Sequence, residues 1–421
     1  MPTDRNDAAR GPLVGYRVLE LCSTIAGPVC ARLLADFGAE VIKVEPPGGG
    51  DSVRSLGYHE GDVSLYAASI LRNKKAITVN LKSAEGVQVV RSLAAQSDVI
   101  VENFRPGTLE RLGLGYDVLV RDNPGLVLVR ITGYGQSGPY HLRPGYGAIC
   151  DALGGVRHLT GDPDRPPTRI ALAATDYLTA VYAAFGALLA LLERARTGRG
   201  QIVDAALYEA AFSMMEAIVP AHGHLKVVPT RVGSRMLGTA PNNLYATRDG
   251  GYLLVTAISD KVFRRLAQAM GKSHLCEDPR FATVRARTKN IEAVDAEVAG
   301  WVGSLDGPQA EDILLKAEVP VSRVYTIADI FSDPHYRARD MLVDMPHQSL
   351  GRLTMAGIVP KLSATPGAIY RTGPDADTDT RAVLTTMLGL SADRVKALEE
   401  QGIVGEEPEG LRKRDKDAEG S

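Results

Sequence analysis

Short apolar runs alternate with amphipathic stretches through the first third of the chain, a pattern that predicts strands alternating with helices. The runs that predict buried strands are Arg17–Cys22 (RVLELC), Val41–Glu45 (VIKVE), Ala76–Leu81 (AITVNL), Asp98–Glu102 (DVIVE) and Gly125–Ile131. The stretches between them predict helices, one ending at Gly38 and another over Ser83–Ala95. Strand, helix and strand in close succession make a βαβ unit, so we expect a parallel sheet with right-handed crossovers.

A long apolar run follows a single acidic residue near the middle of the chain. It covers residues 177–192, and Asp176 is the only charged residue between Arg169 and Glu193. An ionised carboxylate is costly to bury without compensation, and the free N–H groups at the start of a helix supply it. We therefore predict a buried core helix with Thr175 or Asp176 at its N-cap. The apolar run is shorter than the roughly 20 residues that a membrane span needs, so a transmembrane helix is not expected.

The pattern changes at about Val228, where Gly, Pro and Asn become frequent. A strand is predicted at Gly251–Ile258, followed by helical segments to about Ala317. Two amphipathic patches near Thr380–Leu388 and Ala392–Gln401 predict the last helices.

These elements predict an α/β protein with a large, open parallel-sheet domain of Rossmann-like type and a small α+β domain. A length of 421 residues also supports two domains. We expect the large domain to comprise residues 11–225 and 331–403, with the small domain and its linkers at residues 226–330. Residues 404–421 are charged and poor in apolar side chains, so we expect a disordered tail.

Composition narrows the functional classes. Apolar content of 45% and charged content of 23% are ordinary for a globular protein. The net charge of −2 gives no reason to expect a nucleic acid or a membrane as partner. The four cysteines show no CxxC spacing, so we expect neither a metal site nor a disulfide framework. The first residues lack an apolar signal segment, and a cytoplasmic location is the expectation.

Two groups of polar residues follow predicted strands, where open parallel sheets bind their ligands. Lys82 follows one strand, and the loop NFRPG, which contains Asn103, Phe104 and Arg105, follows another. The turn after the first strand lacks GxGxxG, so a dinucleotide cradle is not indicated. One basic residue alone fits a solvated surface charge, and Asp176 alone fits a simple helix cap. Several such groups at one crevice favour a site that contacts phosphate.

Six segments together resemble the class III coenzyme A transferases, the group of formyl-CoA transferase, carnitine CoA-transferase and α-methylacyl-CoA racemase. The segments, in family order, are RVLELCSTIAGPVCARLLADFGAEVIKVEPPGGGD, RNKKAITVNLK, DVIVENFRPGTLERLGLGY, ITGYGQSGPY, ATDYLTAVYAAFGALLALLERARTGRGQIVDAAL and DPHYRARDM. They extend over nearly the whole chain, from about Gly11 to Gly402. The resemblance implies a dimer of interlocked, ring-shaped subunits.

The resemblance also implies a catalytic role for Asp176, which matches the nucleophilic aspartate of the family's transferases. In the implied ping-pong reaction, Asp176 attacks the donor thioester, and the released CoA thiolate returns to form an aspartyl-CoA thioester. The acceptor carboxylate then attacks, a second anhydride forms, and CoA leaves on the acceptor. A closed site protects such an intermediate from water. No permanently bound cofactor is implied, because the coenzyme A thioester is a substrate.

The family's CoA-contacting positions fall on Ile25, Ala26, Val79, Asn80, Leu81, Lys82, Asn103, Phe104, Arg105, Arg111, Arg143, Tyr146 and Gly147. Two departures concern formyl-CoA transferase, which has glutamine at the position of Ile25 and arginine at the position of Pro46. Its tetraglycine loop also has no counterpart near Gly238. A formyl or oxalyl substrate is therefore not expected.

Two alternatives to a self-sufficient transferase remain open. Racemases of the family carry a His-Asp pair where this chain has Tyr146 and Gly147, and the histidine is a base that moves the α-proton. Tyrosine is a poor substitute, because proton abstraction needs a group that titrates near the working pH, so transferase is favoured over racemase. The chain could also be one subunit of a hetero-oligomeric transferase, so both a homodimer and a heterodimer with a paralogous subunit stay open.

The motifs RNKK, GYGQSGP, PGYG and ATDY look closer to family members that use succinyl-CoA and dicarboxylic acids. We therefore expect an acyl-CoA donor, succinyl-CoA, and a dicarboxylic acid acceptor. A dicarboxylate keeps one charge after its other end becomes the thioester, so the site must hold an anion. Arg72 and Arg169 are the candidates, because a guanidinium group can bind a carboxylate through two hydrogen bonds.

Overall fold

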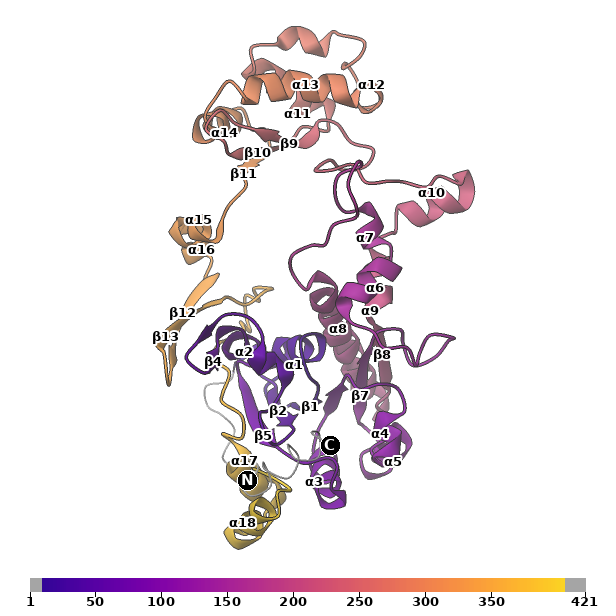
Figure 1. Cartoon of the computed structure of the whole chain (residues 1–421), viewed down its shortest axis with the longest axis vertical. Helices are drawn as coiled ribbons and strands as arrows, with labels where there is room; N and C mark the ends of the chain where they lie inside the picture. The colour runs from indigo at the N-terminus through magenta and orange to yellow at the C-terminus, as the bar shows by residue number, and fades with distance from the viewer. Residues whose placement is uncertain (1–9, 406–421) are drawn as a thin grey trace, which may run out of the picture. The chain divides into compact units, whose positions relative to one another are not determined.

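The computed structural model describes residues 10–405 and contains a six-stranded sheet whose strands run parallel (Figure 1). The strands are β1 (Arg17–Leu21), β2 (Glu40–Glu45), β5 (Lys74–Thr78), β6 (Val99–Glu102), β7 (Val127–Thr132) and β8 (Ile202–Ala206). Their order across the sheet is β5-β2-β1-β6-β7-β8. In the central strand, Val18 pairs with Val41 on one side and with Val99 on the other. The predicted parallel α/β fold is thus confirmed.

Each face of the sheet has its own hydrophobic core, because alternate residues of a strand point to opposite faces. In β1, Val18 belongs to one core and Leu19 to the other. Helices α1 (Ala26–Asp36) and α8 (Ala174–Thr197) pack into the first core, and α3 (Ala84–Ala94) packs into the second. Strands covered on both faces need apolar side chains at nearly every position, which explains the apolar runs in the sequence.

Helix α8 has 24 residues and begins two residues before Asp176. Its N-cap is Ala173, so the prediction that Thr175 or Asp176 caps the helix was wrong. Alanine has the highest helix propensity, and Ala174 extends the helix beyond the predicted start. Asp176 is the third helical residue, in the first turn, where the helix dipole still favours an anion.

The length of α8 does not by itself exclude a membrane span, because an 18-residue window has a mean hydropathy of 1.5. The sequence argument that the helix is too short was therefore wrong. Its packing is that of a core helix, since its inner face lies against α1, β7 and β8. The alanines buried on that face include Ala180, Ala183, Ala187 and Ala190. Val181, Phe185 and Leu192 are exposed.

The described chain divides into two compact units. Unit 1 comprises the residues up to 156, residues 170–220 and the residues from 335 onward, whereas unit 2 comprises residues 157–169 and 221–334. Residues 157–169, which the sequence analysis placed with the large domain, thus belong to unit 2. The antiparallel sheet of unit 2 has the order β11-β10-β9. Its strands are β9 (Asn242–Ala246), β10 (Tyr252–Thr256) and β11 (Val321–Arg323).

Short helices and two hairpins connect these elements. The helices from the middle of the chain are α10 (Ile218–Leu225), α11 (Asp260–Ala269), η2 (Ser273–Cys276), α12 (Val284–Lys289), α13 (Ile291–Val302), α14 (Gly307–Lys316) and α15 (Ile327–Ser332). Further elements are η1 (Ser52–Ser55), β3 (His59–Glu60), β4 (Val63–Ser64), α2 (Leu65–Ile70), α4 (Thr108–Arg111), α5 (Tyr116–Asp122), α6 (Gly147–Leu153), α7 (Val156–Leu159), α9 (Leu207–Ser213) and α16 (Pro334–Ala338).

The C-terminal segment belongs to unit 1, where its last helices join the second core. Its elements are β12 (Leu342–His347), β13 (Gly351–Ala356), α17 (Thr380–Leu388) and α18 (Ala392–Glu400). Val404 is buried and pairs with Val79 in an isolated bridge. The rest of the expected disordered tail, residues 406–421, lies outside the described residues.

Candidate active site

A cavity of about 200 Å³ opens at the carboxyl edge of the parallel sheet. The chain leaves β1 for β2 and β5 on one side, and then returns to build β6, β7 and β8 on the other. The turns after β1 and β6 therefore diverge and leave a crevice, which is where open α/β sheets bind ligands. The lining residues are Ser23, Thr24, Ile25, Ala26, Asn103, Phe104, Arg105, Pro106, Ile131, Thr132, Gly133, His141, Arg143, Pro144, Gly145, Tyr146, Asp176 and Leu207.

Asn103 joins the two turns that flank the crevice. Its side-chain oxygen accepts a hydrogen bond of 2.9 Å from the Ser23 N–H, and its side-chain nitrogen donates one of 2.8 Å to the Ser23 carbonyl. One amide thus satisfies both backbone groups of Ser23. Glu102 also fixes the turn after β6, because it accepts a hydrogen bond of 2.8 Å from the Phe104 N–H and one of 2.6 Å from Arg130.

A buried ion network holds the turn after β1 from beneath. Lys43 Nζ donates to Glu20 Oε1 and to the Cys22 carbonyl, each at 2.9 Å, and lies 2.7 Å from Asp51 Oδ2. Asp51 Oδ1 in turn accepts a bond of 2.8 Å from the Thr24 N–H. Thr24 has a φ of 73°, an unfavourable value for a side chain of this kind, so Asp51 fixes a strained residue in the cavity wall.

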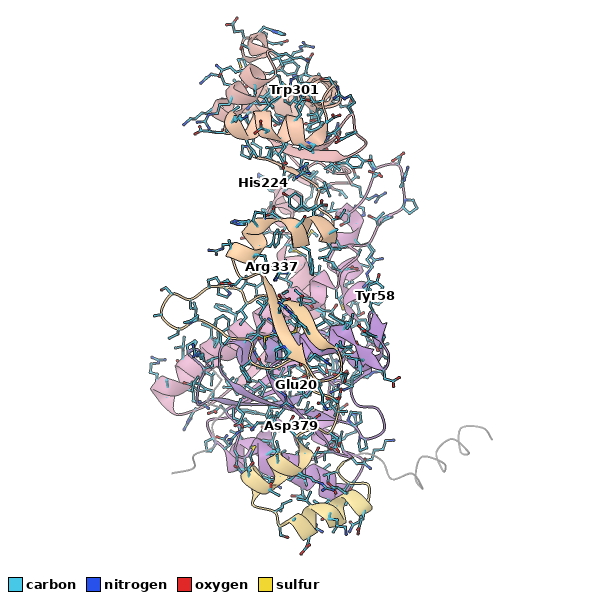
Figure 2. The ribbon with its side chains drawn as sticks, turned by 90° about the vertical axis from the view of Figure 1, so that its left-hand side faces the viewer. Glu20, Tyr58, His224, Trp301, Arg337 and Asp379 are labelled. Carbon is cyan, nitrogen blue, oxygen red and sulfur yellow. The ribbon has the colours of Figure 1, made fainter. Side chains whose placement is uncertain are left out.

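The charges in this network stabilise each other. Glu20, labelled in Figure 2, also accepts a bond of 2.6 Å from Lys74, and both Lys43 and Glu20 are almost fully buried. Burial alone lowers the pKa of Lys43, but Glu20 and Asp51 outweigh it, and the pKa rises above its usual value. The cation is therefore permanent at neutral pH. Apart from Lys43 and Asp51, the partners are more than 20 residues apart in sequence, so residue spacing gave little sign of this network.

Asp176 enters the cavity from the first turn of α8 and lies against Gly147 at the start of α6. A Cβ atom on Gly147 would stand 2.0 Å from Asp176 Oδ2, so glycine leaves the space that the carboxylate occupies. Burial, together with the carboxylates of Asp176 and Asp151, raises the pKa of the Cys150 thiol to about 11. Cys150 therefore stays a neutral thiol near neutral pH.

Basic side chains stand at the opening of the cavity. Arg105 and Arg143 are exposed residues of the lining, and the guanidinium carbon of Arg143 lies 3.5 Å from the centre of the Tyr140 ring. That contact orients Arg143 without neutralising it. Cations that remain solvent-accessible at such an edge can bind an anionic ligand, phosphate groups included.

The structure brings most of the sequence-predicted site residues together. Those that line the cavity are Ile25, Ala26, Asn103, Phe104, Arg105, Arg143, Tyr146 and Asp176. Gly147 contributes the space behind Asp176. Sequence reasoning did not single out Ser23, Thr24, Ile131, Thr132, His141 and Leu207. Several of these end or directly follow β1, β7 or β8, so strand ends were the available signal.

The remaining predicted residues lie outside this cavity. Val79, Asn80, Leu81 and Lys82 follow β5, the edge strand, where the Asn80 N–H donates to the Ile403 carbonyl at 2.8 Å. Arg111 ends α4 and donates to Thr108 at 2.8 Å. All the strands run parallel, so the end of β5 shares its sheet edge with the cavity. A contact of these residues with CoA stays a prediction.

Arg72 does not have the role that was expected for it. Its side chain is 1% exposed, and it donates through Nε and Nη2 to Asp36 at 2.9 and 2.7 Å. Nη1 donates to the Ala356 carbonyl at 2.6 Å. Every nitrogen of the guanidinium group is engaged inside the protein, so the prediction that Arg72 binds a substrate carboxylate was wrong. Arg169, the other candidate, is an exposed residue of unit 2.

The open parallel sheet and a carboxylate-bearing cavity at its switch point define an α/β enzyme. The chain matches the family model of CoA-transferase family III over residues 13–380. It therefore belongs to CoA-transferase family III and is a CoA-transferase, as the sequence segments predicted. It is 44% identical to succinyl-CoA–D-citramalate CoA-transferase of Chloroflexus aurantiacus, with 93% of this chain and 98% of that protein covered.

Two further similarities concern assembly and fold. The chain is 42% identical to the beta subunit of succinyl-CoA–L-malate CoA-transferase of Chloroflexus aurantiacus, with 93% of this chain and 98% of that protein covered. The crystal structure of a CaiB/BaiF family protein from Brucella suis superposes with a TM-score of 0.79 at 32% identity. That match covers 90% of this chain and 100% of the other, so the predicted fold class is confirmed independently.

Proposed function

We propose that this protein transfers coenzyme A from succinyl-CoA to a dicarboxylic acid, with Asp176 as the nucleophile. The observation that carries the proposal is the position of Asp176, a carboxylate in the wall of the cavity at the switch point of the sheet. Two relatives covered over nearly their full length are named as succinyl-CoA-dependent transferases, one for citramalate and one for malate. Both acceptors are dicarboxylic acids.

The reaction has two half-reactions. Asp176 attacks the thioester carbonyl of succinyl-CoA, which gives a mixed anhydride and CoA thiolate. The thiolate attacks the aspartyl carbonyl of the anhydride, and succinate leaves as the aspartyl-CoA thioester forms. The acceptor carboxylate attacks this thioester, and the thiolate released then attacks the acceptor side of the second anhydride. Asp176 is regenerated as a carboxylate, so no proton or electron is left unbalanced.

The bound CoA runs along the carboxyl edge of the sheet. Its thioester end lies at Asp176, and Arg105 and Arg143 at the cavity opening bind its phosphates. The residues 79–82 follow β5, two strands from β1, a separation of about 10 Å at the usual strand spacing. This is within the reach of an extended CoA molecule, so residues 79–82 and Arg111 contact its nucleotide end.

A second chain covers the exposed face of α8. Val181, Phe185 and Leu192 are 51%, 56% and 69% exposed, although they are apolar residues of a long helix. Apolar side chains gathered on one helix face mark a protein–protein contact. The relative named as a beta subunit supports assembly of this kind. The second chain is another copy or a paralogous subunit.

Trapping the aspartyl intermediate tests the proposal. The enzyme is incubated with succinyl-CoA without an acceptor and treated with hydroxylamine or borohydride, and its peptides are weighed by mass spectrometry. We expect modification of Asp176 in the wild type and none in Asp176→Ala, whose CoA transfer falls by at least a thousandfold. Asp117→Ala is the matched control, because Asp117 is an exposed acid in the first turn of α5 and a helix-dipole contribution is worth only about 0.3–1 kcal/mol.

Two results would contradict the proposal. Modification confined to another acidic residue would move the nucleophile away from Asp176. Rapid deuterium uptake at the α-carbon of an enantiopure 2-methylacyl-CoA in deuterated water would favour the racemase. We expect no uptake, because Gly147 supplies no side chain and Tyr146 is the only titratable residue of that pair.

A further inference from the structure

Two arginines, the half-buried Arg32 and the buried Arg72, lie near one carboxylate between α1 and the strand β5. Arg32 and Asp36 lie one turn apart on α1, and Arg72 directly precedes the buried Asn73 and β5. Asp36 is fully committed, since it accepts both hydrogen bonds from Arg72 and a third of 3.0 Å from Asn73. The group therefore holds two cations and one anion, and Arg32 is the cation without its own counterion.

Arg32 has hydrogen-bonding capacity that the described residues do not use. Its Nε is shut off from solvent, and among the described residues no hydrogen-bond acceptor reaches it. Burial and the neighbouring Arg72 lower the pKa of Arg32, so the protein environment itself disfavours the charge. A partly desolvated charge without a counterion is unfavourable, whereas a carboxylate bound across the guanidinium group would supply up to two charge-assisted hydrogen bonds.

A pair of tyrosines lies within electrostatic range of Arg32 and close to Asp176. The hydroxyl oxygens of Tyr66, on α2, and Tyr177, on α8, lie 3.4 Å apart, and Tyr177 directly follows Asp176. Burial, the hydrogen bond with Tyr177 and the charge of Asp176 raise the pKa of Tyr66, while Arg32 opposes them. Tyr66 therefore stands within electrostatic range of both the cation and the carboxylate, and its hydroxyl stays protonated at neutral pH.

We propose that Arg32, assisted by Tyr66 and Tyr177, binds the free carboxylate of the dicarboxylic substrate while the other end of that substrate reacts at Asp176. This assignment rests on the proposed function and replaces the disproved candidate Arg72. Arg32, Arg72 and Asp36 together carry one excess positive charge. The free carboxylate of a four-carbon dicarboxylate supplies the negative charge that neutralises it. An acyl chain without that charge leaves the cation partly desolvated and unpaired, so specificity arises from the missing partner as much as from the contact.

The test measures binding separately from chemistry. Dissociation constants for succinyl-CoA and butyryl-CoA are determined by calorimetry with Asp176→Ala and with the double variant that also carries Arg32→Met. We expect Asp176→Ala to bind succinyl-CoA roughly a hundredfold more tightly than butyryl-CoA. The double variant should bind both within about threefold of each other. Arg91→Met is the matched control, since Arg91 belongs to a half-exposed surface ion pair with Asp122, and it should leave the preference intact.

Stability gives a second readout. Arg32→Met should keep or raise the Tm, because it replaces an unpaired charge by an apolar chain, and free succinate should raise the Tm of the wild type alone. Equal loss of binding for both thioesters, or an unchanged preference, would overturn the assignment. If Arg32→Met made an oligomer dissociate while the preference for succinyl-CoA was preserved, Arg32 would instead pair with a second chain. That result would also overturn the assignment. Failure of the wild type to transfer CoA would count against the proposed function only, because the binding preference is measured without turnover.

Discussion

Asp51→Asn removes one buried negative charge while keeping the shape of the side chain. Asp51 is 3% exposed and lies 2.7 Å from Lys43 Nζ. Asparagine retains an acceptor for the Thr24 N–H, but it presents an amide N–H₂ or a neutral oxygen to the lysine. Breaking a buried ion pair from one side costs about 3–5 kcal/mol. Because the hydrogen bond to Thr24 is retained, we expect the free energy of unfolding to fall by the lower value of this range, about 3 kcal/mol.

A loss of this size is measurable as a shift in thermal unfolding. For a large unit, about 3 kcal/mol corresponds to a decrease in Tm of roughly 6 °C or more. Asp122→Asn is the control, because it makes the same chemical change in the surface ion pair with Arg91, where the two side chains are 35% and 37% exposed. Exposed pairs contribute about 0–1 kcal/mol, so the control should shift the Tm by no more than about 2 °C.

The contribution of Asp51 to stability depends on pH in a direction that its pKa determines. Burial raises the pKa of Asp51, but Lys43 and the backbone N–H groups of Thr24 and Val53 outweigh it, and the folded-state pKa lies below its usual value. The stabilisation is therefore complete above the unfolded-state pKa, near 4, and is lost as the pH falls through the folded-state pKa. The gap in Tm between wild type and Asp51→Asn should narrow below about pH 4. Equal shifts for the two asparagine variants at neutral pH would refute the reasoning.

Two further predictions follow from single contacts. Gly147→Ala should lower kcat by roughly a hundredfold or more with little change in Tm. The reason is that the new Cβ would stand 2.0 Å from Asp176 Oδ2 and displace the carboxylate. An unchanged kcat would show that this position of Asp176 is not the reactive one. The purified chain should run at twice the mass of one chain in light scattering, and Phe185→Asp, with Val284→Asp in unit 2 as control, should make it monomeric. A wild type that is monomeric alone would favour the paralogous partner.

Much of the fold follows from the apolar pattern. Helix α17 forms at Thr380–Leu388, as predicted, because the amphipathic stretch lies between a polar residue, Asp379, and a helix-ending glycine, Gly389. Strand β5 forms at Lys74–Thr78 rather than at Ala76–Leu81. Lys74 reads as a surface residue, yet its ammonium group is buried against Glu20, 54 residues away. Pairing at that sequence distance moves a strand boundary in a way that local hydrophobicity does not show.

The site was predictable where it depends on strand ends and not where it depends on charge pairing. The loop containing Asn103 was expected to bind a ligand because it follows a strand, and it lines the cavity. Arg72 was wrongly chosen because a basic motif looks accessible in sequence, whereas Asp36 neutralises it in the fold. Arg32 was overlooked for the opposite reason, since it stands in an apolar helix that appears purely structural. Which of two arginines remains unpaired is decided by packing.

The charged side chains discussed for unit 1 therefore divide into two kinds with opposite responses to mutation. Lys43 and Asp51 are neutralised by each other and by their neighbours, so losing one of them leaves an unpaired charge and lowers stability. Arg32 is already without a partner among the described residues, so losing it removes an unpaired charge and leaves stability intact or improved. Asp51→Asn should thus lower the Tm, whereas Arg32→Met should abolish the preference for a dicarboxylic thioester without lowering the Tm. If both variants lowered the Tm by similar amounts, Arg32 would stabilise the fold as Lys43 and Asp51 do. Its proposed role in substrate selection would then be refuted.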